Sequence, residues 1–255
     1  MVFCVRQEVI IPSSGNLEED NWLEKLITGL GEMACPVELA LPHKMDDYHL
    51  IEPRLDEMAA RINGQGVRCV AVHAPQGRLG DDTFEVWGEK TVRFAEEVGA
   101  HIVVFHPHRV PQASRPGEQS QVVRQLRRLQ RQTGLTVTVE AFGSRRVVLS
   151  PEEICQMGIP LTLDTSHLFH ERSLQIIEQY ARNIAHVHLS EARDGGVHLP
   201  IRQAGFEILE HLRRYGWHGA VCLEYLWEYR DEALQDCRLL QEREDMRELL
   251  TRVDI

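Results

Sequence analysis

Short apolar runs alternate with longer amphipathic segments along the whole chain, and no linker rich in Ser, Pro or Gly separates them. Short, continuously apolar runs are typical of parallel strands that are buried on both faces. The alternation therefore predicts strand–helix units packed into one domain over residues 1–255. The expected strands are 2–5, 37–41, 67–73, 101–106, 135–140, 160–164, 184–189 and 219–224, and the expected helices are 17–30, 52–62, 82–98, 118–132, 151–157, 171–180, 203–215 and 231–250.

Eight strand–helix units in 255 residues favour a single (β/α)8 barrel, the TIM barrel of the α/β class. An open, doubly wound parallel sheet is the alternative architecture. Neither G-x-G-x-x-G nor G-x-x-x-x-G-K-[ST] follows an expected strand, so the phosphate-binding loops that such sheets commonly carry are missing from the sequence. We therefore expect the closed barrel.

The third to eighth expected strands each end in a histidine or a carboxylate on the same face of the strand. Side chains of a strand alternate between two faces, and in a barrel these faces are the interior and the surrounding helices. In strand 67–73, Val70 and Val72 are expected to face the helices. Cys69, Ala71 and His73 are expected to face the interior. Because active sites of such barrels lie at the carboxyl ends of the strands, six inward side chains should share one pocket: His73, His106, Glu140, Asp164, His188 and Glu224.

Composition and charge narrow the functional classes. The chain is 43% hydrophobic and 26% charged, and it has neither an apolar stretch of bilayer length nor a signal-peptide pattern after Met1. Its six cysteines are scattered without a C-x-x-C pair, which is typical of reduced thiols in a cytoplasmic protein. The net charge of −11 argues against a chain that coats nucleic acid, although it leaves a local basic cleft open.

Three imidazoles and three carboxylates at one barrel mouth indicate a metal site. Carboxylates within a few ångströms repel one another and raise each other's pKa unless a cation neutralises them. A mixed histidine and carboxylate set favours zinc, manganese, cobalt or iron over magnesium or calcium. Taken singly, each residue is more often a hydrogen-bonded core or rim residue. The repetition of the pattern in six consecutive strands favours a shared divalent-metal site, with zinc or manganese as the expected ion.

Further candidates lie in the loops that follow the strands. His167 and His198 are placed to hold an additional ion or to orient substrate, and a solvated loop histidine is the alternative. His186 should lie one layer below His188 in a packing or supporting role. Arginines after the strands could grip a phosphate or carboxylate, and Arg193 is expected to contact a substrate oxygen or anion. These loop arginines are Arg109, Arg115, Arg145, Arg146, Arg193 and Arg202.

Seven short strings, in chain order, resemble the xylose-isomerase-like barrels. That superfamily includes sugar and sugar-phosphate isomerases and epimerases, and the endonuclease IV type of abasic-site nuclease (AP endonuclease family 2). The resemblance covers strands three to eight, nearly three quarters of the chain. The strings are Ala71-Val-His73-Ala-Pro75, Val104-Phe-His106-Pro107, Thr138-Val-Glu140, Thr162-Leu-Asp164-Thr-Ser-His167, His186-Val-His188-Leu, His198-Leu-Pro and Leu223-Glu224.

The resemblance to the isomerases and epimerases implies one divalent ion held by Glu140, Asp164, His188 and Glu224. In those relatives the ion binds neighbouring carbonyl and hydroxyl oxygens of a sugar. Two glutamates, here Glu140 and Glu224, then exchange a proton with carbon through a metal-bound enediolate. The resemblance therefore implies an isomerase or epimerase of a small sugar, sugar phosphate or related polyol.

The resemblance to endonuclease IV implies a different chemistry. Its three-zinc cluster adds histidines that match His73, His106, His167 and His198, so that His73 and His106 would share Glu140 with a second ion. Gly196 stands where the nuclease pattern has an aspartate, which leaves a third ion in doubt. The segment 107–121 also carries no aromatic wedge for bending a duplex. We therefore expect one or two ions.

Three functions remain in competition, and we favour the sugar isomerase or epimerase with a small-molecule substrate. The alternatives are metal-dependent hydrolysis of abasic-site DNA and a barrel that only binds its ligand. The acidic charge, the short loops and the pair of glutamates favour the first. The substrate and the oligomeric state have no signature in the sequence.

Overall fold

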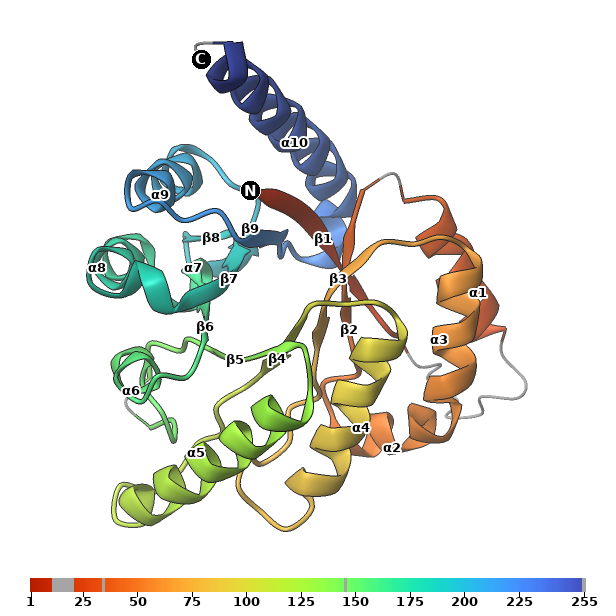
Figure 1. Cartoon of the computed structure of the whole chain (residues 1–255), viewed down its shortest axis with the longest axis vertical. Coiled ribbons are helices and arrows are strands. Elements are labelled where there is room, and N and C mark those ends of the chain that lie inside the picture. The colour runs from red at the N-terminus through yellow and green to blue at the C-terminus, as the bar shows by residue number, and fades with distance from the viewer. Residues whose placement is uncertain (11–20, 34, 145, 254–255) are drawn as a thin grey trace.

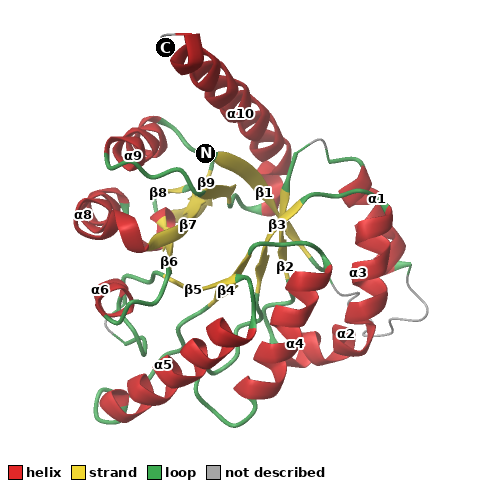
Figure 2. Cartoon of the chain, viewed as in Figure 1, coloured by secondary structure: helices red, strands yellow, loops and turns green. Residues whose placement is uncertain are grey.

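Eight parallel strands close into a barrel in the computed structural model, which describes residues 1–10, 21–33, 35–144 and 146–253, with side chains through residue 245. Figures 1 and 2 show the strands at the centre and the helices around them. The strands follow the circular order β1-β10-β7-β6-β5-β4-β3-β2, so the first and last barrel strands are neighbours. The strands are β1 (Val2–Glu8), β2 (Val37–Ala40), β3 (Cys69–His73), β4 (Ile102–Phe105), β5 (Thr136–Glu140), β6 (Leu161–Asp164), β7 (Ile184–Leu189) and β10 (Ala220–Leu223).

Amphipathic helices cover the outside of the barrel. In α9, for example, Ile208, Leu209 and Leu212 fall on one face and are buried, which is the spacing expected of a helix packed on a sheet. The helices are α1 (Trp22–Gly31), α2 (Met45–Ile51), α3 (Leu55–Gly64), α4 (Phe84–Glu97), α5 (Arg115–Gln132), α6 (Pro151–Gln156), α7 (Thr165–Leu168), α8 (His170–Tyr180), α9 (Gln203–Arg214) and α10 (Arg230–Val253), with short 3-10 turns at Glu52–Arg54, Ala181–Asn183 and Trp227–Tyr229. Within the described ranges, none of these helices has both the length and the apolar character needed to cross a bilayer.

The expected (β/α)8 barrel is confirmed, and the expected strands match the observed ones to within a few residues. The helix expected at 52–62 is divided into a turn and α3, with α2 before it. Residues 17–20 of the first expected helix lie outside the described residues. The last helix, α10, projects beyond the barrel in Figure 1, and its Glu244 carboxylate lies 3.1 Å from the Met1 amino group.

The expected alternation of strand side chains is wrong at the start of β3. Cys69 packs in the outer core between strands and helices, whereas Val70 and Ala71 both join the interior cluster. The cause is an irregular pairing with β2, in which Val37 pairs with Cys69 but the next residue, Glu38, pairs with Ala71. This bulge places two successive residues on the same side of the sheet. Beyond it, His73 faces the mouth as expected.

A short antiparallel hairpin follows β7 and was not expected from the sequence. Its strands are β8 (Glu191–Arg193) and β9 (Gly196–Leu199). The turn residues Asp194 and Gly195 both have positive φ angles, 53° and 81°. A two-residue turn with this backbone matches the right-handed twist of the strands it joins, and Asp-Gly is a preferred pair for it. The hairpin brings His198 back to the mouth of the barrel.

Candidate metal centre

The six side chains expected at the mouth are gathered there and are all buried, with Glu140 at the middle of them. One oxygen of Glu140, Oε2, lies 3.3 Å from His73 Nε2 and 2.7 Å from His106 Nε2. The other oxygen, Oε1, lies 3.4 Å from His188 Nδ1. Because Glu140 ends β5, it faces histidines from both sides of the barrel. It is therefore a member of two potential ligand groups, His73–His106–Glu140 and Glu140–Asp164–His188–Glu224.

The donor atoms of the four-residue group are arranged to hold a divalent cation. Asp164 uses Oδ1 to accept hydrogen bonds from Ser166 Oγ (3.0 Å) and from the His167 backbone N–H (2.8 Å). Its Oδ2 is buried and has no hydrogen-bond partner within the described part of the chain. A buried carboxylate oxygen normally accepts a hydrogen bond or binds a cation. One ligand atom from each of the four residues lies within 4.8 Å of the others, so the group fits a metal ion.

Electrostatics at the group agree with this interpretation. Burial raises the pKa of Asp164 well above its usual range, and the carboxylates of Glu224 and Glu140 raise it further. Burial would also raise the pKa of Glu140, but its contacts with His106, His188 and His73 outweigh burial and hold it well below the usual range. Carboxylates this close together favour a positive charge between them.

The tautomer of His73 is set by the backbone. Its Nδ1 lies 3.2 Å from the carbonyl oxygen of Ala74, so the proton of the neutral ring lies on Nδ1 and the lone pair on Nε2 faces Glu140. Burial lowers the pKa of His73 to about 3, and the positive charge of Arg6 adds to this effect. A neutral imidazole whose unprotonated nitrogen lies beside a carboxylate is in the protonation state that binds a metal ion.

Two residues of the site were not predicted from the sequence, because they do not follow the pattern of a histidine or carboxylate at the end of a strand. Arg6, near the end of β1, forms a buried ion pair with Glu224 Oε1, and its Nη2 lies 3.1 Å from His43 Nε2. Burial opposes the charge of Arg6, but the carboxylates of Glu224, Glu38, Glu140 and Glu8 together outweigh burial and raise the arginine pKa. Glu38, in β2, is fully buried against His186 and His188. Both interrupt apolar runs, but Arg6 is neither a histidine nor a carboxylate, and Glu38 stands near the start of its strand.

His167 and His198 lie together beside the four-residue group. Their rings meet edge to face at 5.0 Å between centroids, and with Asp164 they form a third potential ligand group. His198 Nδ1 also lies 3.3 Å from Ser166 Oγ. The hairpin contributes no carboxylate to this group within the described residues, and Asp194 is exposed at the turn.

The structure does not bring Arg193 together with the metal ligands. Its Nη1 donates to Glu191 Oε2 (3.0 Å) and to the carbonyl oxygen of Pro200 (2.8 Å). With Arg202 it lines a separate hollow next to Glu232 and Asp236. The expected contact between Arg193 and substrate stays a prediction.

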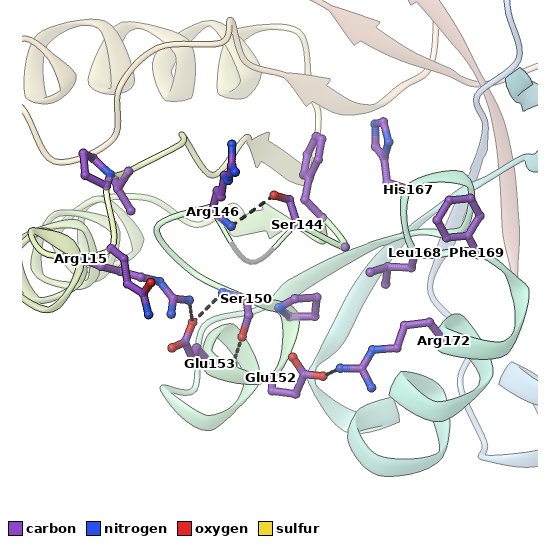
Figure 3. Close-up of a pocket in the computed structure, with 16 residues that line it drawn as sticks. Arg115, Ser144, Arg146, Ser150, Glu152, Glu153, His167, Leu168, Phe169 and Arg172 are labelled. Atoms are coloured by element: carbon purple, nitrogen blue, oxygen red, sulfur yellow. Dashed lines mark hydrogen bonds and ion pairs between the residues drawn. The ribbon is translucent and has the colours of Figure 1, made fainter. Parts of the chain in front are cut away.

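Two neighbouring cavities open at the mouth. The first, of about 430 Å³, is lined by Glu140 and Glu224 together with other residues of the mouth. The second, of about 1380 Å³, is shown in Figure 3 and shares Phe142 and His167 with the first. The ring of Phe142 stacks on His167 at 4.3 Å, so these two side chains stand between the cavities.

The second cavity is lined by two of the loop arginines, Arg115 and Arg146, and by Arg172 of α8. Arg115 pairs with Glu153 and Arg172 with Glu152, as Figure 3 shows. The guanidinium of Arg146 is exposed and has no ion pair among the residues described. Of the remaining loop arginines, Arg109 forms a backbone bridge with Val147, and Arg145 lies outside the described residues.

Comparisons with known proteins agree with this fold. The family model described as xylose isomerase-like TIM barrel matches residues 36–248. A search of curated proteins found no match.

Among solved structures, 3-keto-D-glucoside 4-epimerase from E. coli is similar with a TM-score of 0.64 and 17% identity, covering 95% of this chain and 99% of that one. An AP endonuclease of family 2 from Brucella melitensis gives 0.62 and 15%, covering 88% and 93%. The IOLI protein with a bound zinc atom gives 0.61 and 16%, covering 93% and 95%. At sequence identities of 15–17%, these solved structures show only that the fold is shared. The family model, in contrast, matches most of the chain. The chain belongs to the xylose isomerase-like TIM barrel family.

Proposed function

We propose that the protein is a divalent-metal-dependent isomerase or epimerase of a small sugar, sugar phosphate or related polyol. One observation carries this proposal. Of the four residues in the central group, Glu140 and Glu224 line the 430 Å³ cavity, whereas Asp164 and His188 are buried behind its surface. A substrate in that cavity would therefore meet both carboxylates, which is the requirement for moving a proton off and onto carbon.

Glu140, Asp164, His188 and Glu224 would hold the ion, and zinc or manganese suits this mixed donor set. A divalent cation there supplies Lewis acidity, which acidifies the C–H bond next to a carbonyl. His73 and His106 would hold a second ion through Glu140. The zinc atom in the similar IOLI structure supports zinc for this chain.

The proton transfer falls to the two glutamates. One carboxylate takes the proton from the carbon beside the carbonyl, which leaves an enediolate, and a carboxylate returns a proton to carbon. Return to the neighbouring carbon, together with transfer of the hydroxyl proton to the former carbonyl oxygen, gives isomerisation. Return to the opposite face of the same carbon gives epimerisation. Arg6 beside Glu224 and the histidines beside Glu140 orient the two carboxylates for these roles.

The neighbouring cavity supports a substrate with an anionic group. Arg146 contributes an exposed guanidinium there, and planar guanidinium groups bind phosphate through two N–H donors. A sugar phosphate whose reacting carbons lie by Glu140 would direct its phosphate past Phe142 and His167 toward this arginine.

Proton–deuterium exchange tests the proposal directly. Metal-loaded protein is incubated in D2O with a panel of ketoses, aldoses and their phosphates, and the substrate C–H signals are followed by NMR. Exchange is expected with the wild type and is expected to disappear in Glu140→Gln. Glu118→Gln is a matched control, because Glu118 also contacts a histidine, His108 (3.2 Å), but lies outside both cavities. Exchange that persists in Glu140→Gln would refute the role of Glu140.

Hydrolysis of a phosphodiester is the second candidate. It is favoured by the groups His73–His106–Glu140 and Asp164–His167–His198, which flank the central group. Clustered ions activate water and stabilise a leaving oxygen. The missing hairpin carboxylate counts against a third ion. Nicking of an abasic-site duplex that disappears in Glu140→Gln would replace the isomerase proposal with this one. If neither activity is found, a barrel that only binds its ligand is favoured.

A further inference from the structure

Glu38 makes a contact across the inside of the barrel that the proposed function does not require. It belongs to β2, whereas the histidines it contacts belong to β7, and β1 and β10 lie between those strands in the circular order. All three side chains are fully buried. A carboxylate in that position loses its hydration and needs hydrogen-bond donors from the protein.

The two nitrogens of the His188 ring face different groups. Nε2 lies 3.1 Å from Glu38 Oε1 and 3.2 Å from Glu38 Oε2. Nδ1 lies 2.8 Å from Glu224 Oε2 and 3.4 Å from Glu140 Oε1. The ring therefore spans from Glu38 on one side to the metal ligands on the other.

The positions of the protons follow from this geometry. Both nitrogens of His188 face carboxylates, which accept hydrogen bonds when ionised, so both can carry a proton when no ion is bound. A cation held by Glu140, Asp164 and Glu224 would displace the proton on Nδ1 and leave the proton on Nε2, which is donated to Glu38. The lone pair is then on Nδ1, where the metal ligands are. His186 supports the same carboxylate, since its Nε2 lies 2.6 Å from Glu38 Oε2 and its Nδ1 lies 2.9 Å from the carbonyl oxygen of Ala220.

We propose that Glu38 is a positioning residue, which fixes the orientation and tautomer of His188 so that Nδ1 is the metal-binding nitrogen. A carboxylate behind a ligand histidine also makes the imidazole a better donor. The inference rests on the metal centre of the proposed function and is independent of the reaction catalysed. Glu38, His186 and His188 also lie close enough together to be considered as a metal site of their own. In that case both nitrogens of His188 would have to bind an ion. A hydrogen bond from His188 Nε2 to Glu38 explains the same contacts without a further ion.

Metal affinity in Glu38 variants tests the inference. Zinc binding to the metal-free full chain is measured by competition with a chelator, and the affected binding step is identified as the one that Asp164→Ala abolishes. Glu38→Ala should weaken that step about 10- to 100-fold. Glu38→Gln should weaken it less, because an amide oxygen can still accept from His188 Nε2 while its NH2 donates to His186. Unchanged affinity in Glu38→Gln and Glu38→Ala would overturn the proposal, and if Glu38→Ala does not fold, Glu38→Gln alone decides.

A control and a spectroscopic readout separate positioning from simple support of the fold. Thr138→Val removes a buried interior hydrogen bond, between Thr138 Oγ1 and Thr162 Oγ1 at 2.7 Å, and should leave the zinc affinity unchanged. Side-chain 15N NMR of the zinc-loaded wild type should show His188 protonated on Nε2, and zinc bound through Nε2 would overturn the inference. Loss of one zinc equivalent in His186→Gln would also overturn it, by making the three residues a metal site. Wild type that binds no zinc would instead refute the metal centre itself.

Discussion

Phe169 has a backbone conformation that a residue with a side chain rarely adopts, and replacing it by glycine should stabilise the protein. Its φ is 62° and its ψ is 164°, between α7 and α8. The surrounding contacts hold it there, because its carbonyl oxygen accepts from the backbone N–H of Ser173 (3.0 Å) and from Ser173 Oγ (2.8 Å) at the start of α8. The side chain is 63% exposed at the rim of the second cavity, so it gains little from burial.

The size of the effect follows from these observations. A non-glycine residue in this region costs about 1–3 kcal/mol of strain. Glycine relieves that strain but loses about 0.5–1 kcal/mol through the greater freedom of the unfolded chain. The carbonyl group that begins α8 is retained in either case. We expect Phe169→Gly to raise the free energy of unfolding by about 1 kcal/mol, and the melting temperature of a chain of this size by about 2–4 °C.

Phe169→Ala isolates the strain, because it removes the ring and keeps the Cβ atom. The two variants are compared by urea unfolding and by thermal unfolding. At an ordinary position glycine is the less stable of the two, whereas here Phe169→Gly should be more stable than Phe169→Ala by about 1 kcal/mol. If the alanine variant is equally or more stable, the reasoning about backbone strain is refuted.

Three further predictions concern the buried charges. Arg6→Met removes the guanidinium that pairs with Glu224, and it should lower the free energy of unfolding of the metal-free protein by about 3 kcal/mol. Much of this loss should be recovered when zinc is added. An equal loss with and without zinc would contradict the prediction. Protein purified without chelator should contain zinc or manganese by elemental analysis, less of it in His73→Ala and least in Asp164→Ala, and wild type free of metal would end the metal hypothesis. Glu244 accepts from Arg213 (2.8 Å) and contacts the Met1 amino group, and although burial opposes it, these partners lower its pKa. The stabilising effect of Glu244 is therefore complete above its pKa in the unfolded chain, and it is lost as the pH falls through its pKa in the folded protein. Glu244→Gln should lower the free energy of unfolding by about 1–3 kcal/mol at neutral pH and by progressively less in acid. Unfolding experiments at a series of pH values can measure this difference.

The sequence predicted the barrel and most of the site because buried parallel strands read as continuous apolar runs, in which a polar residue stands out. Arg6 and Glu38 also interrupt apolar runs, but neither is a histidine or carboxylate at the end of its strand, so the rule that selected the other six residues does not select them. The bulge at Cys69 and Val70 is different in kind, because it depends on how β3 pairs with β2, and a strand's own residues do not encode its neighbour's register. The hairpin turn at Asp194 and Gly195 carried a recognisable Asp-Gly signal.

The sharing of Glu140 between two ligand groups has a thermodynamic consequence. An ion bound by His73, His106 and Glu140 would withdraw negative charge from the same carboxylate that serves Asp164, His188 and Glu224. The two occupancies are then linked, and the factor by which one ion changes the affinity of the other must be the same in both directions. Titrations of zinc and manganese, alone and in competition, would therefore report one coupling free energy and not two independent sites. In such a centre the identity of the two bound ions depends on which ion is present at the higher concentration.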